Sequence, residues 1–215
     1  MTGRSARPFD AVVFDFSGVV VSSAFDAMHA VLGEQLDREA ALELLVGPYD
    51  HDTDHPWHRV ERGEIELVEW VAHIDAEAAR RELAVDWSAM RRSFAALTVH
   101  EVVVDRIRAL RSDGYRTALL TNNVKEGSGA WRAMVPVDDL FDVVVDSSEV
   151  GMRKPDPRIY LHTLDLLGGI APARAVFLDD HPGNVVGARG AGLAAIVVGD
   201  PIDAILELDE LLSAP

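Results

Sequence analysis

Five short apolar runs alternate with longer stretches of helical pattern along the chain. The runs cover residues 11–14, 116–120, 141–145, 175–178 and 194–198. They are rich in Val, Ile, Leu and Phe without polar alternation, which predicts strands buried on both faces. Helical patterns over 101–112, 156–167 and 182–191 separate most of them and end beside glycines. This alternation predicts an α/β fold with a doubly wound parallel sheet.

Residues 22–100 interrupt the alternation, because they contain helical patterns and no convincing strand. The clearest helix is expected over 64–83. Its predicted apolar face consists of Ile65, Val68, Val71, Ala72 and Ala79. A segment of this length is too long for a loop, so we predict a second domain. The expected division is a catalytic core over 1–21 and 101–215, with an inserted helical cap over 22–100.

Charge and composition restrict the possible partners. The chain has 215 residues, of which 36 are acidic and 20 basic, giving a formal charge of −16. Because such a field repels phosphate backbones and anionic lipid, neither nucleic acid nor a membrane is an expected partner. The absence of cysteine excludes disulfides, zinc–thiolate sites and a cysteine nucleophile. No apolar run approaches the ~20 residues of a membrane span and no secretory signal begins the chain, so a cytoplasmic location is expected.

Polar side chains follow four of the predicted strands. In a parallel sheet, ligands bind at the carboxyl ends of the strands. The residues at these ends are Asp15, Ser17, Thr121, Asn122, Asp146, Asp179 and Asp180. A carboxylate at the position of Asp15 suits a nucleophile or a metal ligand, or else caps the next turn.

Two adjacent aspartates, Asp179 and Asp180, end the fourth strand. Their mutual repulsion is relieved by a divalent cation, and with Asn184 they offer the hard oxygen ligands that Mg²⁺ prefers. The alternative is that one caps the following helix while the other is solvated. Lys154 is one of only two lysines, which indicates a need for an ammonium that screens an aspartate and an incoming phosphate. Taken alone, the segment around it fits an ordinary surface lysine before a helix better.

Four segments together resemble one family. FDFSGVV, LLTNN, GMRKPDPRIY and VFLDDHPGNVVGARGAG follow the strands in order, and the resemblance covers residues 11–200. These motifs are similar to those of the haloacid dehalogenase-like (HAD) hydrolase superfamily, and the helical insertion resembles the cap of its helical-cap branch. The segments are most similar to phosphatases such as the phosphatase domain of soluble epoxide hydrolase and bacterial sugar-phosphate phosphatases.

The resemblance implies a Mg²⁺-dependent phosphatase of a small phosphorylated metabolite. Asp15 would attack phosphorus and form an aspartyl phosphate. The carbonyl of Ser17 and the carboxylate of Asp180 would ligate Mg²⁺ beside it, with Asp179 and Asn184 surrounding these ligands. The phosphoryl group would be held by Thr121, Asn122 and Lys154. An ammonium and Mg²⁺ would cancel the repulsion between the nucleophile and the anionic phosphate.

One position departs from the family. Most of its phosphatases carry an Asp two residues after the nucleophile as general acid–base, where this chain has Ser17. Losing such a group typically costs 10²–10⁴ in rate. Ser17 therefore predicts a good leaving group, a longer-lived phosphoenzyme or an acid from elsewhere. The histidines of the cap, His51, His55 and His58, are one candidate source, and a solvated acidic loop is the alternative reading.

Two other functions compete with the phosphatase. A binding or regulatory protein that lost turnover is supported by Ser17 alone. A haloacid dehalogenase usually carries an aromatic residue at that position and needs no metal, so Ser17 and the pair Asp179–Asp180 disfavour it. The related phosphonate hydrolases need a cap lysine, and residues 22–100 contain none. The sequence specifies neither the substrate nor the oligomeric state.

Overall fold

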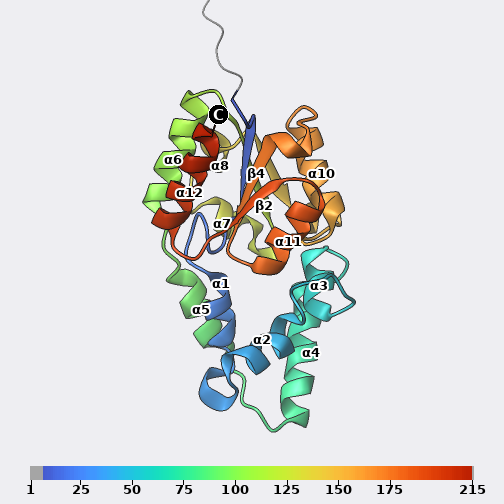
Figure 1. Ribbon diagram of the computed structural model, residues 1–215. Coiled ribbons are helices and arrows are strands. Elements are labelled where there is room, and N and C mark those ends of the chain that lie inside the picture. Colours follow the sequence, from blue (N-terminus) through green and yellow to red (C-terminus); the bar gives the residue numbers. More distant parts are fainter. Residues whose placement is uncertain (1–6, 215) are drawn as a thin grey trace, which may run out of the picture.

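Five parallel strands form the centre of the protein in the computed structural model, which describes residues 7–214 (Figure 1). The strands are β1 (Ala11–Phe14), β2 (Arg116–Thr121), β3 (Val143–Asp146), β4 (Ala175–Asp179) and β5 (Ala194–Val197). Their order in the sheet is β3-β2-β1-β4-β5. The register pairs Phe14 with both Leu119 and Leu178, so the carboxyl ends of the three central strands lie at one edge. The predicted doubly wound parallel sheet is confirmed.

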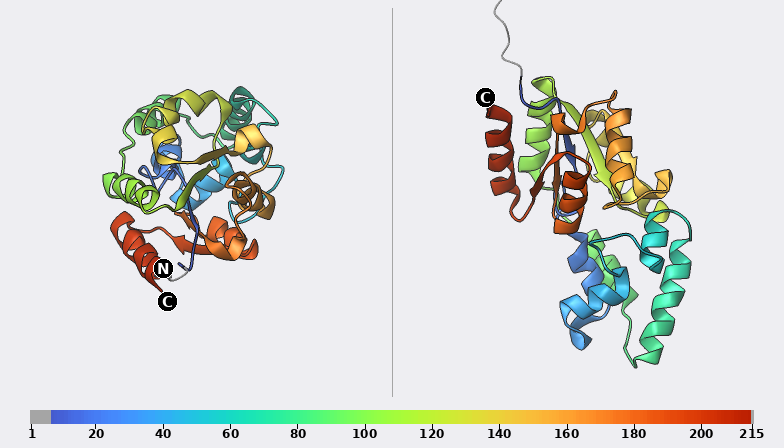
Figure 2. Two further views of the ribbon diagram at one scale, coloured as in Figure 1. Left: turned by 90° about the horizontal axis from the view of Figure 1, so that it is seen from above. Right: turned by 45° about the vertical axis from the view of Figure 1, so that its right-hand side comes forward.

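Helices cover both faces of this sheet (Figure 2). The helices outside the insertion are α6 (Glu101–Ser112), α7 (Ser128–Arg132), α8 (Val137–Leu140), α9 (Ser147–Val150), α10 (Pro157–Leu166), α11 (Pro182–Gly190) and α12 (Pro201–Ser213). Val12 and Phe14 pack with α6 and α12, whereas Ala11 and Val13 pack with α10 and α11. Successive side chains of a strand point to opposite faces, so each apolar strand residue contributes to one of two cores.

Polar residues followed by proline begin three of these helices. Asp156 accepts a hydrogen bond from the amide of Arg158, and His181 and Asp200 cap α11 and α12 in the same way. Proline in the first turn suits a helix start because its missing N–H would have no intrahelical partner there. These caps set the starting points of α10 and α11 and confirm the helices predicted over 156–167 and 182–191.

The inserted segment forms a helical lobe beyond the carboxyl ends of the strands (Figure 1). Its helices are α1 (Ala24–His29), α2 (Arg38–Val46), α3 (Pro56–Glu61), α4 (Leu67–Arg80) and α5 (Trp87–Ala95). Figure 1 shows α1 and α5 on one side, α3 and α4 on the other, and α2 between them. Trp70 is fully buried between Trp57 and Trp87, with ring centroids 4.9 and 5.3 Å away. The lobe thus has a core of its own.

The predicted apolar face of the helix over 64–83 is wrong for Val68, Ala72 and Ala79, which are exposed, whereas Ile65 and Val71 pack against the core of the lobe. The helix is α4, and its buried residues are Trp70, Ile74 and Ala78. Val68, which we expected to be buried, is 64% exposed. The helix buries only a narrow stripe of residues spaced four apart, which carries the large Trp70 ring. Its alanines did not indicate which side is buried, because they occur all around the helix.

Two chain crossings connect the lobe to the sheet region. The crossings run antiparallel, because Val21 forms a bridge with Val99. The amide of Ser22 donates to the carbonyl of Thr98 at 2.8 Å, and the amide of His100 donates to the carbonyl of Val20 at 2.8 Å. The two connections therefore form one hydrogen-bonded ribbon. Over the described residues, none of the helices is both long enough and apolar enough to span a lipid bilayer.

Candidate active site

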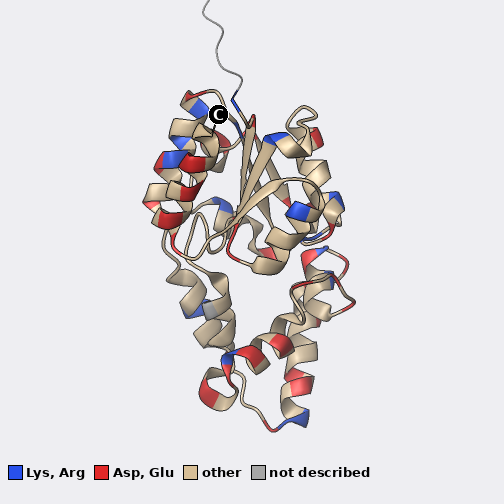
Figure 3. Ribbon diagram, in the orientation of Figure 1, with Lys and Arg blue, Asp and Glu red and all other residues tan. Residues whose placement is uncertain are grey.

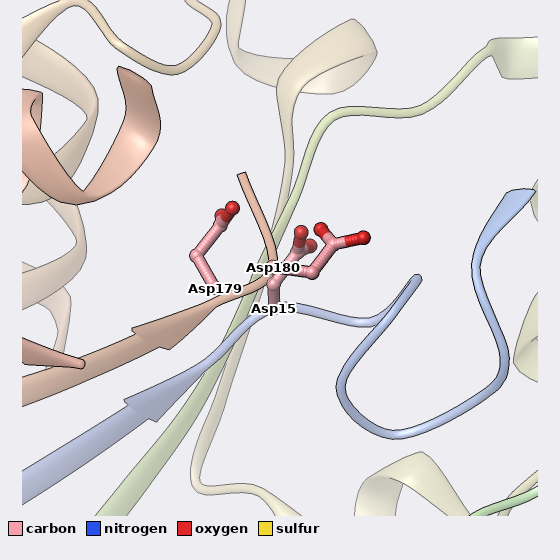
Figure 4. A group of neighbouring side chains, drawn as sticks. All are labelled: Asp15, Asp179 and Asp180. Atoms are coloured by element: carbon pink, nitrogen blue, oxygen red, sulfur yellow. The ribbon is translucent and has the colours of Figure 1, made fainter. Parts of the chain in front are cut away.

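Three carboxylates meet where β1 and β4 end (Figure 4). Asp15 follows β1, Asp179 is the last residue of β4 and Asp180 follows it, and oxygens of all three lie within 4.8 Å of one another. The loop after Asp15 approaches closely because Gly18 adopts a φ of +77°. A Cβ atom at Gly18 would lie 2.0 Å from Oδ2 of Asp180. Only glycine therefore allows the loop to pass the acidic group in this way.

A buried lysine links two of these carboxylates. Nζ of Lys154 lies 2.8 Å from Oδ1 of Asp15 and 2.6 Å from Oδ2 of Asp179. Asn122 holds the lysine in place, since its amide group accepts from the backbone N–H of Lys154 at 2.8 Å and donates to its carbonyl at 3.0 Å. The side chain of Asn122 is thus occupied, and a phosphate contact there would fall to backbone amides. Thr121, also predicted to bind phosphate, is buried and lines a cavity together with Asp15, Lys154 and Asp180.

The site holds more negative than positive charge. Burial raises the pKa of Asp15 well above its usual value, although the Lys154 ammonium opposes this. Burial and the neighbouring Asp179 raise the pKa of Asp180 to about 7. Burial lowers the pKa of Lys154, but the carboxylates of Asp15 and Asp179 outweigh it and leave that pKa raised. The lysine is therefore charged, and three carboxylates around one ammonium provide a site that a divalent cation would stabilise.

The surrounding contacts distinguish the two adjacent aspartates. Asp179 is saturated by protein donors, because it accepts from Lys154, from the His181 amide at 2.8 Å and from Nδ2 of Asn184 at 3.0 Å. Asp180 lines the cavity and, among the residues that the structure describes, accepts a side-chain hydrogen bond from Ser23 alone, at 3.3 Å. Oδ1 of Asn184 is buried and has no hydrogen-bond partner among the described residues. An unsatisfied oxygen beside open carboxylates fits a hydrated Mg²⁺, which is the cofactor that the sequence predicts.

Ser17 also reaches the site. Its side chain lines the cavity next to Asp15. Its Oγ accepts a hydrogen bond from the amide of Ala24 at 2.8 Å, at the start of α1. The hydroxyl therefore anchors α1 to the loop that follows Asp15.

The remaining strand-end aspartate does not join the group. Asp146 caps α9 by accepting from the amide of Ser148 at 3.0 Å, and it is not among the residues that line the cavity. Asp146 therefore serves as a helix cap. Its position at a strand end does not by itself distinguish a capping aspartate from a ligand.

None of the three cap histidines lines the cavity described here. His51 is exposed and pairs with Asp50, and His55 caps α3. His58 is fully buried, with Nδ1 accepting from the amide of Thr53 at 3.0 Å. Burial, together with the positive charges of nearby residues, lowers the pKa of His58 to about 3. The contacts of these three histidines are structural, so none of the three is placed to donate a proton beside Asp15.

Sequence analysis missed one buried ion pair. Arg153, adjacent to Lys154, reaches into the helical lobe, where its Nε donates to Oε2 of Glu61 at 2.7 Å. Both side chains are almost fully buried. Glu61 also accepts from the hydroxyl of Tyr49 at 2.6 Å and from Nε1 of Trp57 at 2.9 Å. The position of Arg153 in the GMRKP segment was visible, but nothing in the sequence singled out Glu61 as its partner.

A comparison with protein families identifies the chain. The family model for haloacid dehalogenase-like hydrolases matches residues 9–192. This chain belongs to that family. The resemblance found from the four segments is confirmed, and the protein is a hydrolase.

Curated relatives extend the comparison. The hydrolase is 32% identical to mouse acyl-CoA dehydrogenase family member 10 across 100% of this chain and 20% of that protein. It is 29% identical to rat bifunctional epoxide hydrolase 2 across 92% of this chain and 38% of that protein. The chain thus spans well under half the length of these two relatives. A sesquiterpene phosphatase of Aspergillus oryzae is 26% identical and matches at 95% of this chain and 97% of its own.

The fold also matches solved structures. An HAD family enzyme of Bacteroides thetaiotaomicron, solved in complex with magnesium and inorganic phosphate, superimposes with a TM-score of 0.62. The match covers 89% of this chain and 96% of the other at 20% identity. At this identity the similarity shows that the two proteins share a fold.

Proposed function

We propose that this hydrolase is a Mg²⁺-dependent phosphatase that cleaves phosphoric monoesters through Asp15. The observation that carries the proposal is the contact between Asp15 and the buried ammonium of Lys154, beside the open carboxylate of Asp180. A carboxylate nucleophile can approach an anionic phosphate only where positive charge offsets the repulsion. The phosphatase among the relatives and the magnesium–phosphate complex of a structural neighbour support this reading.

The hydrogen bonds of Asp15 select the attacking oxygen. Oδ1 accepts from Nζ of Lys154 at 2.8 Å and from the amide of Phe16 at 2.6 Å. Among the described residues no donor engages Oδ2. Oδ2 would therefore bond to phosphorus while the ester P–O bond breaks. Water then attacks phosphorus, which releases inorganic phosphate and restores the carboxylate.

The metal would be held by Asp15, Asp180 and the carbonyl of Ser17. Asp179 and Asn184 would lie behind these ligands, consistent with the protein donors that already occupy Asp179. The ion would supply positive charge that stabilises the phosphoryl oxygens in the transition state. Lys154 would remain charged throughout and keep the carboxylate of Asp15 oriented.

The leaving group would receive its proton from solvent. A serine hydroxyl has a pKa far above 7, so Ser17 cannot act as an efficient general acid. Its Oγ instead anchors α1 through the Ala24 amide. Activated esters such as p-nitrophenyl phosphate should therefore be cleaved faster than alkyl esters, whose cleavage would be limited by delivery of a proton from solvent.

Phosphate release tests the proposal. We expect p-nitrophenyl phosphate and acetyl phosphate to be hydrolysed with Mg²⁺ and not with EDTA, and Asp15→Asn to abolish release. Asp146→Asn is the matched control, because Asp146 lies at a neighbouring strand end outside the cavity, and it should retain most activity.

Other outcomes would point elsewhere. Absence of phosphate release from every ester, together with retained phosphate binding, would favour the non-catalytic binding protein. Chloride release from 2-chloropropionate without metal would instead favour the dehalogenase.

A further inference from the structure

A cavity of about 650 Å³ extends from the catalytic carboxylates into the helical lobe. Its polar end consists of Asp15, Thr121, Asn122, Lys154 and Asp180. These residues lie at the carboxyl edge of the sheet, so a phosphoryl group bound there would direct its ester substituent away from the sheet. The character of the remaining wall therefore determines which substituent can be accommodated.

The rest of the wall is largely apolar. Helices α1, α3 and α5 of the lobe contribute to it, and so does the segment after β2. Its side chains include Phe25, Met28, Trp57, Met90, Trp131 and Met134. Aromatic and methionine side chains bury much apolar surface, and methionine adapts to irregular shapes. Such a wall favours a flexible hydrocarbon over a rigid polar group.

The charged groups of the wall argue against polar substituents. Lys154 is the only basic residue among those that line the cavity, and it already contacts Asp15 and Asp179. Of the acidic residues beyond the carboxylates of the site, Glu61 is occupied by Arg153 and by its hydrogen bonds to Tyr49 and Trp57, and Glu126 accepts from the amide of Leu67 at 2.8 Å. A sugar would replace few of its hydrogen bonds to water against a largely apolar wall, and a second phosphate would meet no further cation.

We infer that the substrate is a phosphate monoester of an apolar alcohol, whose hydrocarbon tail fills this cavity. The inference rests on the proposed phosphatase function and specifies its substrate class. At ~30 Å³ per group of the size of water, the cavity holds roughly 20 such groups, enough for a phosphate and a tail of some ten or more carbons. The substrate is thus more apolar than the small metabolite that the family resemblance suggests.

A homologous series of alkyl phosphates tests the tail. Ethyl, butyl, hexyl and octyl phosphate remain monomeric at assay concentrations and differ only in apolar surface. We expect kcat/KM to rise about fourfold per added methylene, the factor that corresponds to ~0.8 kcal/mol of burial. Glucose 6-phosphate and AMP should be poorer substrates than hexyl phosphate.

If the alkyl esters are hydrolysed with a kcat/KM that does not change with chain length, the inference is overturned. Hydrolysis of p-nitrophenyl phosphate distinguishes this result from failure of the proposed function. If neither the aryl nor any alkyl ester releases phosphate, the phosphatase itself is refuted. If the aryl ester is cleaved but no alkyl ester is, or if all are cleaved at rates independent of chain length, only the apolar tail is refuted.

Variants of the wall give a second readout. Met90→Gln keeps the side-chain size but places an amide where α5 lines the cavity, and Met134→Gln does so where the segment after β2 lines it. Each should lower the octyl-to-ethyl ratio of kcat/KM by roughly fivefold, because the polar atoms lose hydration to the tail. Leu206→Gln is the control, since Leu206 is 58% exposed on α12 and should leave the ratio unchanged. An unchanged ratio in both wall variants would contradict the inference.

Discussion

At the scale of single residues, the site depends on how each polar atom is already occupied. Asp179 is surrounded by protein donors, whereas the neighbouring Asp180 faces the cavity. Two identical side chains, adjacent in the chain, are thereby given different chemical roles. The same reasoning applies to Ser17, whose hydroxyl holds the start of α1 and offers no proton of suitable acidity.

Ser17→Asp should restore a general acid–base. The carboxylate could still accept from the Ala24 amide, and we expect kcat for alkyl phosphates to rise by about 10², at the lower end of the usual effect. For p-nitrophenyl phosphate, whose leaving group needs no proton, the gain should be small. Steady-state kinetics on both esters measure the difference, and Ser17→Asn is the uncharged control. Equal gains from the Asp and Asn variants would refute the role of an Asp at this position as general acid–base.

Some residues of the candidate site could be predicted because they directly follow a strand in the sequence. Asp15 and Asp180 follow apolar runs, and parallel strands bring such ends to one edge. What Asn122 contacts was not predictable, because its amide meets the backbone of Lys154, which lies 32 positions later. Hydrogen-bond partners of this kind depend on tertiary distances that no local pattern encodes.

At the scale of elements, the pair Arg153–Glu61 joins α3 of the lobe to the segment that carries Lys154. Glu61→Gln would leave the buried guanidinium without its main counter-charge. We expect the free energy of unfolding to fall by about 3 kcal/mol, as for other buried pairs broken on one side. Urea unfolding measures this loss.

Asp105→Asn provides the comparison for that experiment. Asp105 pairs with Arg108 at 2.8 Å, both side chains are exposed, and such a surface ion pair is worth at most about 1 kcal/mol. Equal losses from the two variants would show that the buried pair contributes no more than a surface pair.

His58 on α3 should make the protein acid-sensitive. Its pKa is lowered to about 3 by burial and by Arg153, His55 and Arg62, whereas the unfolded chain titrates near the ordinary value of ~6.5. Between these values the unfolded state binds more protons, so stability present above pH ~6.5 is lost as the pH falls. Each pH unit in this window should cost at most about 1.4 kcal/mol.

Unfolding midpoints at several pH values check this effect. His58→Asn keeps an acceptor for the Thr53 amide without a titrating ring, and its stability should fall less between pH 6.5 and 5 than that of the wild type. His51→Asn is the control, because His51 is exposed. Parallel pH profiles for the wild type and His58→Asn would exclude this origin of acid sensitivity.

The elements themselves were predictable to different degrees. The strands followed from their composition, since fully buried parallel strands are continuous apolar runs. The face of α4 was not, because a stripe anchored by one tryptophan leaves Val68 at the surface. For a helix that packs through a narrow stripe, the side that is buried depends on the neighbouring helices and not on average hydrophobicity.

At the scale of the whole molecule, the formal charge of −16 acts on every anionic substrate. Acidic side chains are spread over both the sheet region and the lobe (Figure 3). The apolar runs along the chain did not predict the cavity between the sheet region and the lobe. Its shape depends on how helices from both sides of the lobe pack together.

Salt should therefore accelerate capture of substrate. At saturating Mg²⁺, screening shortens the Debye length to ~10 Å at 0.1 M and weakens the repulsion between the acidic surface and the phosphate dianion. We expect kcat/KM for butyl phosphate to rise a few-fold between low salt and about 0.2 M NaCl. Steady-state assays at constant pH measure this change in kcat/KM, with sucrose as a control for osmotic effects. A fall in kcat/KM would show that the local charge of the site dominates the encounter.

The paired crossings at Val21 and Val99 have a consequence for protein engineering. Because the amide of Ser22 reaches the carbonyl of Thr98, the chain leaves the sheet region and returns to it at nearly the same point. A short turn could close this gap, and a foreign helical segment could be spliced between the same two positions without stretching either flank. We expect chimaeras built at this junction to keep the chemistry of one parent while acquiring the ligand preference of the other.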